Sequence, residues 1–236
     1  MNVNTLESIL DSFANSGEIF SNELEFQFEL SKKLESLPCV KDVIFEAMTT
    51  KNAIGSIKSS IKSTGKYAAT NKEYTDILVQ TIDDRYYAIE LKFKTDLKPY
   101  VYKSSRRGNV LVMAQGAYDI NAYAFWKDVS RLENINKRYF GRSIKIEKGF
   151  VIFLTNCKQY RKNNFSGSTI WKNYAMNDGR IVKGPSTFTF ASGALTYGKY
   201  NAIKINNSYG PLMWRDYIVN QSPLPDFSYL ILAVTP

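Results

Sequence analysis

Two carboxylates and one ammonium group, those of Asp76, Glu90 and Lys92, are the side chains of this sequence that most clearly indicate chemistry. Asp76 lies in segment 74–80, and the other two lie in segment 86–94. Both segments alternate apolar and polar residues and are rich in β-branched and aromatic types, a pattern typical of β-strands. An Asp-Asp pair between the segments predicts the turn that joins the two strands.

The length of that turn decides whether the three side chains meet. Glu90 and Lys92 share one face of their strand because alternate residues point the same way. A two-residue turn would set Asp76 opposite Leu91, and its side chain would then lie on the other face. We therefore predict a loop of odd length or a β-bulge, which places Asp76 opposite Glu90 or Lys92.

These residue types suit a divalent cation and an activated water. Mg²⁺ prefers oxygen ligands, and one or two carboxylates complete its shell together with waters and phosphate oxygens. Such a cation lowers the pKa of a bound water and offsets the charge that grows on a phosphoryl group. A neighbouring lysine can hold the water, stabilise the added negative charge, or lose its own proton if burial lowers its pKa. The pattern suggests phosphodiester hydrolysis.

Composition limits the alternatives. The chain of 236 residues has no histidine, which excludes Ser-His-Asp and Cys-His catalysis, histidine-based zinc sites and any imidazole base. Lysine and arginine number 31 against 22 acidic residues, a formal net charge of +9. A basic balance of this size favours a polyanionic partner, but an excess of solvated lysines explains it equally well.

Cysteine usage and hydropathy indicate the compartment. Cys39 and Cys157 are far apart and match no metal-binding or redox spacing, so we expect free thiols in a reducing environment. The first residues lack the basic flank and apolar run of a signal peptide, and no apolar stretch reaches the length of a membrane span. We expect a soluble, cytoplasmic protein that does not contact a membrane.

The hydrophobic periodicity predicts a single domain, 1–236, with a three-layer α/β architecture around a mixed sheet. Residues 163–210 are rich in Ser, Gly, Asn, Thr and Tyr, and we expect a β-rich extension over about 156–236 rather than a second domain. The expected elements are helices at 6–16 and from Asn22 to Pro38, strands at 40–48, 74–80 and 86–94, a long helix from about Val110 to Glu133, and strands at 149–155 and 227–234.

Asp76 followed by Glu90-Leu91-Lys92 resembles the D…ExK signature of the PD-(D/E)xK nucleases, the restriction-endonuclease-like superfamily. The predicted element order, αβββαβ, matches the core of that family over about residues 20–155. Thr75 precedes Asp76 where the motif often has proline. The resemblance implies a restriction-endonuclease-like α/β/α fold in which Asp76 and Glu90 bind Mg²⁺, with Mn²⁺ as a substitute, and Lys92 serves the water.

The same resemblance implicates two further residues. The family often adds a glutamate from the preceding helix, and Glu23 fits that position, although an acid in the first turn of a helix is also favoured by the helix dipole. Some members carry a glutamine four residues before a tyrosine on the following helix. Gln115 precedes Tyr118 by three, and we expect it on the inner side of the long helix.

Basic residues near the motif are candidates for contacts with nucleic acid. Lys103, Arg106 and Arg107 flank the predicted site, and segment 51–72 contains five lysines and no acid. Solvated loops explain both stretches equally well.

Taken together, these residues predict a Mg²⁺-dependent endonuclease that hydrolyses DNA in restriction, defence or repair. A catalytically inactive nucleic-acid-binding module of the same fold is the alternative, and a structural protein with a buried ion network is a third. The sequence leaves open the choice of DNA or RNA and whether the chain acts as a homodimer.

Overall fold

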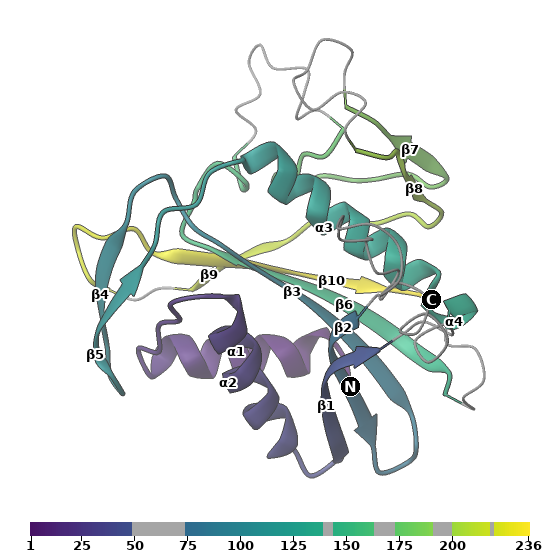
Figure 1. Cartoon of the computed structure of the whole chain (residues 1–236), viewed down its shortest axis with the longest axis horizontal. Helices are drawn as coiled ribbons and strands as arrows, with labels where there is room; N and C mark the ends of the chain where they lie inside the picture. Colours follow the sequence, from purple (N-terminus) through teal and green to yellow (C-terminus); the bar gives the residue numbers. More distant parts are fainter. Residues whose placement is uncertain (49–73, 139–143, 163–172, 191–199, 218–219) are drawn as a thin grey trace, which may run out of the picture.

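The alternation of apolar and polar residues produces a central six-stranded sheet (Figure 1). The computed structural model describes residues 1–48, 74–138, 144–162, 173–190, 200–217 and 220–236. The lysine-rich segment 51–72 lies outside the described residues. In spatial order the strands are β1 (Val40–Met48), β2 (Tyr74–Thr81), β3 (Tyr86–Lys94), β6 (Ile146–Thr155), β10 (Phe227–Val234) and β9 (Trp214–Tyr217).

The sheet is mixed, as the sequence predicts. Strands β3 and β6 are parallel, and the four other neighbouring pairs are antiparallel. Because β6 is covered on both faces, it is an unbroken apolar run from Phe150 to Leu154. The parallel pair requires a crossover, and the long helix between β3 and β6 supplies it.

Helices cover both faces of the sheet and give the predicted three layers (Figure 1). Helices α1 (Val3–Asn15) and α2 (Glu23–Glu35) pack on one face, and α3 (Tyr118–Glu133) packs on the other. A short helix, α4 (Ile135–Arg138), follows α3. Each side has its own apolar core, and alternate side chains of the central strands enter one core or the other. No helix in the described ranges is both long and apolar enough to span a bilayer.

The expected helix start at Val110 is wrong. Val110 belongs to a hairpin of β4 (Tyr100–Ser104) and β5 (Gly108–Val112), and α3 begins only at Tyr118. Val110 and Val112 are two residues apart, and both are buried because they lie on one face of a strand. Gly108, at φ +71°, allows the hairpin to turn.

The C-terminal segment forms part of the central sheet as well as a β-rich extension. A second small hairpin, β7 (Ser186–Phe188) and β8 (Ile203–Ile205), packs near α3, in keeping with the expected β-rich region. Strands β9 and β10, in contrast, complete the central sheet, with β10 hydrogen-bonded between β6 and β9. The part of the fold that carries the motif therefore depends on residues up to Val234.

The start of α2 shows how the sequence positions one end of the candidate site. The Asn22 side chain accepts a hydrogen bond from the backbone N–H of Glu25 at 2.9 Å, as the predicted capping box requires. The Glu25 carboxylate accepts from the backbone N–H of Ser21 rather than from that of Asn22. The first turn of α2 is thus fixed, and Glu23 is its first residue.

Replacing Asn22 with alanine is expected to lower the free energy of unfolding by about 1 kcal/mol, because the first turn of α2 loses its cap. Urea denaturation followed by circular dichroism measures this. Asn4→Ala, within α1 rather than at its cap, is the matched control and should change stability by less than about 0.5 kcal/mol. Equal effects from both substitutions would contradict the assigned cap.

Candidate functional site

The connection between β2 and β3 contains an odd number of residues. The backbone N–H of Thr81 donates to the carbonyl of Arg85, so residues 82–84 form a three-residue loop. The register pairs Ile77 with Ile89, which sets Asp76 across from Glu90. The predicted odd-length loop is confirmed. Asp76 and Glu90 thus lie on the same face of the sheet, the face covered by α3.

Asp76 lies where β2 separates from β3. The ladder between these strands ends at the Ile77–Ile89 pair, which leaves backbone N–H groups of β3 without a partner on β2. Side-chain carboxylates take their place. Asp76 Oδ2 accepts from the N–H of Leu91 at 2.6 Å, and Glu23 Oε2 accepts from the N–H of Phe93 at 2.8 Å. Two of the predicted site acids are thus fixed to the strand that carries the third.

Helix α2 holds Asp76 from the other side. The buried side chain of Gln27 donates to the backbone carbonyl of Asp76 at 2.6 Å and to Glu46 Oε1 at 3.3 Å. The ladder between β1 and β2 omits the Glu46–Asp76 pair, and Glu46 adopts φ +46°. A glutamate in the left-handed region is strained by roughly 1 kcal/mol, so the surrounding sheet must impose it. Both neighbours of β2 therefore leave Asp76 at a local break in the sheet.

Helix α3 places two charged residues over Glu90 and Lys92, and the four side chains pair crosswise. Lys92 Nζ lies 2.7 Å from Asp128 Oδ2, and the Arg131 guanidinium contacts the Glu90 carboxylate. Arg131 also lies 3.3 Å from Asp128 Oδ1. We call these four side chains the charge quartet. Glu90 is 0% exposed, whereas the side chain of Arg131 is 20% exposed and reaches the surface.

The surroundings shift the pKa values of the motif residues. Burial lowers the pKa of Lys92, but Asp128, Glu23 and Asp76 more than offset this, so its pKa lies above the ordinary value. Lys92 therefore remains an ammonium group, which fits holding a water or stabilising negative charge and argues against losing its proton. Burial also raises the pKa of Asp76 to about 6, against the opposing effects of Lys92 and the Leu91 N–H.

Burial raises the pKa of Glu90 well above its ordinary range. The charges of Asp128 and Asp76 add to this rise, and Arg131 and Lys92 oppose it. Three carboxylates thus repel one another within a poorly solvated space. Such repulsion is relieved either by protons or by a cation.

The donor set fits a hard divalent cation in its chemistry. Asp76, Glu90 and Asp128 offer carboxylate oxygens, and Oε1 of Glu90 has no hydrogen-bond donor among the described residues. Among the described residues, no three acidic or cysteine side chains are already arranged around one point as a metal site. Arg131 occupies the position beside Glu90 that a cation would need.

The remaining predicted residues lie apart from this cluster. Gln115 is in the loop before α3, half-buried, and its backbone N–H donates to the Asp96 carbonyl, so the expected position on the inner side of a helix is wrong. Lys103, Arg106 and Arg107 belong to the β4–β5 hairpin.

Two of these basic residues already have acidic partners. Arg106 pairs with Glu18 and Glu29, and Arg107 pairs with Glu25 and lies 3.9 Å from Glu18. These contacts fasten the hairpin to α2 and offset much of the positive charge. Lys103 is exposed, and its backbone N–H and carbonyl both hydrogen-bond to the Gln221 side chain.

Asp128, Arg131 and Gln27 are functional candidates beyond those the motif indicates. The available signal is the periodicity of α3, because Asp128 falls within the apolar stripe of Phe125 and Leu132. An acid in such a stripe requires a buried partner, and Lys92 is that partner.

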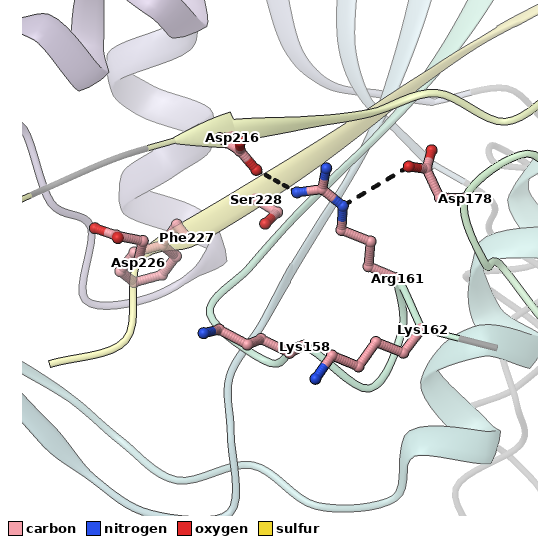
Figure 2. Close-up of a pocket in the computed structure, with 8 residues that line it drawn as sticks. All are labelled: Lys158, Arg161, Lys162, Asp178, Asp216, Asp226, Phe227 and Ser228. Atoms are coloured by element: carbon pink, nitrogen blue, oxygen red, sulfur yellow. Dashed lines mark hydrogen bonds and ion pairs between the residues drawn. The ribbon is translucent and has the colours of Figure 1, made fainter. Parts of the chain in front are cut away.

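A separate cavity of about 480 Å³ lies where β6 ends and β10 begins (Figure 2). Arg161 bridges Asp216 on β9 and Asp178, which lies 3.9 Å away (Figure 2). Lys158 and Lys162 line the same cavity. None of its lining residues belongs to the charge quartet, so the cavity is distinct from the candidate site.

The chain shows no match to models of known protein families, to curated proteins or to solved structures. The candidate site is therefore interpreted from its own residues and geometry. These define a mixed α/β fold with a buried cluster of opposite charges at a break between two central strands.

Proposed function

We propose that this protein is a metal-dependent endonuclease of the restriction-endonuclease-like class that hydrolyses phosphodiester bonds in DNA. The observation that carries the proposal is the three-residue loop, which sets Asp76 across from Glu90, two residues from Lys92 on one strand. Chance pairs of surface charges do not account for Glu90, which is fully buried.

The residues have distinct roles in this proposal. Asp76 and Glu90 are the ligands of Mg²⁺ or Mn²⁺, which supplies an activated water and offsets charge on the phosphoryl group. Lys92 remains protonated beside Asp128 and donates hydrogen bonds to the attacking water or to the phosphate. Glu23, bonded to the N–H of Phe93 and 3.6 Å from Lys94, adds a carboxylate at the rim of the site.

Charge favours a polyanionic substrate. The formal net charge of +9 attracts a phosphate backbone, and the absence of histidine leaves carboxylates, lysine and metal-bound water to carry out hydrolysis. Lys103 is an exposed basic residue of the hairpin and a candidate for contact with phosphates. DNA, with a role in restriction, defence or repair, is the substrate that the motif implies.

Cleavage assays with Mg²⁺ and with Mn²⁺ test the proposal. Supercoiled plasmid, linear duplex, single-stranded DNA and RNA are incubated with the wild type and with Glu90→Gln. We expect at least a ~100-fold loss of activity in the variant, because a ligand of the metal and its charge are removed together. Glu147→Gln, on an exposed face of β6, is the matched control and should cleave at the wild-type rate.

The result that would contradict the proposal is equal cleavage by wild type and Glu90→Gln, or no cleavage of any of the four substrates with either metal. Circular dichroism of both variants establishes that the fold is intact before the rates are compared.

A second function is supported by one observation, the contact between Arg131 and Glu90. Because this contact already neutralises the buried carboxylate, the same fold without turnover is a coherent alternative. Such a nucleic-acid-binding module would bind DNA with a steep salt dependence and would cleave nothing. A duplex-binding titration at several salt concentrations, run beside the cleavage assays, distinguishes the two.

A further inference from the structure

The contact between Glu90 and Arg131 is incomplete on both sides. Glu90 Oε2 contacts the Arg131 guanidinium, but Glu90 Oε1 has no donor among the residues that the structure describes, and Arg131 Nε has no acceptor there. The pair is nevertheless largely buried, with Glu90 at 0% exposure. Buried charges that satisfy only part of their bonding capacity are costly, and both groups retain capacity for another partner.

Arg131 lies between the buried acid and the surface. Its side chain is 20% exposed, whereas Glu90 is inaccessible and Asp128 is 7% exposed. Its guanidinium contacts Glu90 and is 3.3 Å from Asp128, one helical turn back along α3. If Arg131 leaves Glu90, the interaction with Asp128 can keep the guanidinium near the site.

Lys92 is less free to change partners. Its ammonium group lies 2.7 Å from Asp128 and donates to the Leu91 carbonyl at 2.8 Å. Arg131, with its forked donors and an unfilled Nε–H, is the better residue to bind a phosphate through two parallel hydrogen bonds.

We propose that Arg131 changes partners when the site is loaded. In the free protein Arg131 neutralises Glu90. When Glu90 becomes a ligand of a divalent cation, the Arg131 guanidinium binds a non-bridging oxygen of the substrate phosphodiester and keeps its ion pair with Asp128. This inference rests on the proposed function, because it takes Glu90 as a ligand of the metal.

The exchange couples the two ligands. Glu90 cannot serve a divalent cation while Arg131 occupies it, and a bound phosphate draws Arg131 away. Metal and nucleic acid therefore each make the binding of the other more favourable, and the coupling must be equal in both directions. Free protein should take up metal weakly, and protein bound to nucleic acid should take it up more tightly.

The test measures metal binding rather than turnover. Mn²⁺ uptake is measured by calorimetry at pH 8, first with Mn²⁺ alone and then beside a phosphorothioate duplex, whose linkages resist hydrolysis. The wild type should bind Mn²⁺ about tenfold more tightly with the duplex than without it. Arg131→Gln should bind Mn²⁺ about tenfold more tightly than the wild type in the absence of duplex, since no guanidinium competes for Glu90, and the duplex should add little.

Two further variants sharpen the test. Arg131→Lys keeps the charge but loses the fork, so it should bind Mn²⁺ alone as the wild type does and show a smaller effect of the duplex. Lys127→Gln removes an exposed charge from the neighbouring position of α3 and should leave both affinities unchanged. If Arg131→Gln fails to fold, as thermal melting would show, Arg131→Lys alone decides the matter through the effect of the duplex.

The inference is overturned if Arg131→Gln binds Mn²⁺ no more tightly than the wild type while the duplex enhances binding in both. It is equally overturned if Arg131→Lys shows the full effect of the duplex. Failure of the proposed function gives another result, because neither the wild type nor any variant would then take up Mn²⁺ with or without the duplex.

Discussion

Replacing Asp128 with leucine should lower the free energy of unfolding by about 3–5 kcal/mol, because it removes one partner of a buried ion pair. Lys92 would lose its nearest counter-charge, and Arg131 would lose its second one. Lys92→Met should be destabilising for the same reason. The double variant Lys92→Met/Asp128→Leu should recover most of the loss, since two apolar side chains then replace two charges. Urea denaturation in EDTA gives the four free energies of the cycle.

An exposed ion pair provides the control for this cycle. Lys41 Nζ lies 2.8 Å from Asp84 Oδ1, nearly the distance of the buried pair, but both side chains are more than half exposed. Lys41→Met should therefore cost less than about 1 kcal/mol. If the double variant is as unstable as the two single losses added together, the Lys92–Asp128 pair does not act as a unit.

The same variants separate a structural role of the charge quartet from a catalytic one. A stable double variant without cleavage supports the proposed endonuclease, because Lys92 is then needed for turnover but not for folding. A stable double variant with full cleavage would favour the reading of the quartet as a structural ion network.

Replacing Asp76 with asparagine should stabilise the metal-free protein by up to about 3 kcal/mol at pH 8. Burial raises the pKa of Asp76 from 3.8 to about 6, so the folded state binds the proton more tightly than the unfolded state does. Well above pH 6 the Asp76 carboxylate is ionised in both states, and the folded state is destabilised by the full cost of burying the charge. Below about pH 4 it is protonated in both, and the penalty disappears.

Denaturant melts of wild type and Asp76→Asn at pH 4, 6 and 8 in EDTA follow this dependence. The gain should shrink to about 0.5 kcal/mol at pH 4, and asparagine can still accept the hydrogen bond from the Leu91 N–H. Asp42→Asn, on the exposed face of β1, is the matched control and should change the free energy of unfolding by less than about 0.5 kcal/mol. If Asp76→Asn is less stable than the wild type at pH 8, then the ionised Asp76 carboxylate does not destabilise the folded state.

Local patterns predict much of the sheet and its helices. Strand β1 and strand β10 have the bounds that their apolar runs indicate, and the Asn22 cap begins α2 where the motif places it. The odd-length loop between β2 and β3 is one of the two predicted solutions, because a two-residue turn would place Asp76 on the face opposite Glu90. Short-range periodicity is sufficient for these features.

Features that depend on distant partners are not predictable in this way. Leu111 and Ala114 continue the apolar stripe of α3 in the sequence by coincidence. The β4–β5 hairpin that contains Leu111 is fastened to the α2 region by ion pairs of Arg106 and Arg107. The place of β10 within the sheet likewise depends on pairing with β6 across many residues. The burial of Asp128 is explained by its ion pair with Lys92, which lies far away in the sequence.

The position of β10 bears on when the candidate site can form during synthesis of the chain. β10 lies between β6 and β9, so the sheet stays open along β6 until residues 227–234 have left the ribosome tunnel. A nascent chain that already carries Asp76, Glu90 and Lys92 therefore lacks the strand that supports them. We expect emergence of β10 from the tunnel, rather than emergence of the motif, to mark the point at which the sheet around the candidate site is complete.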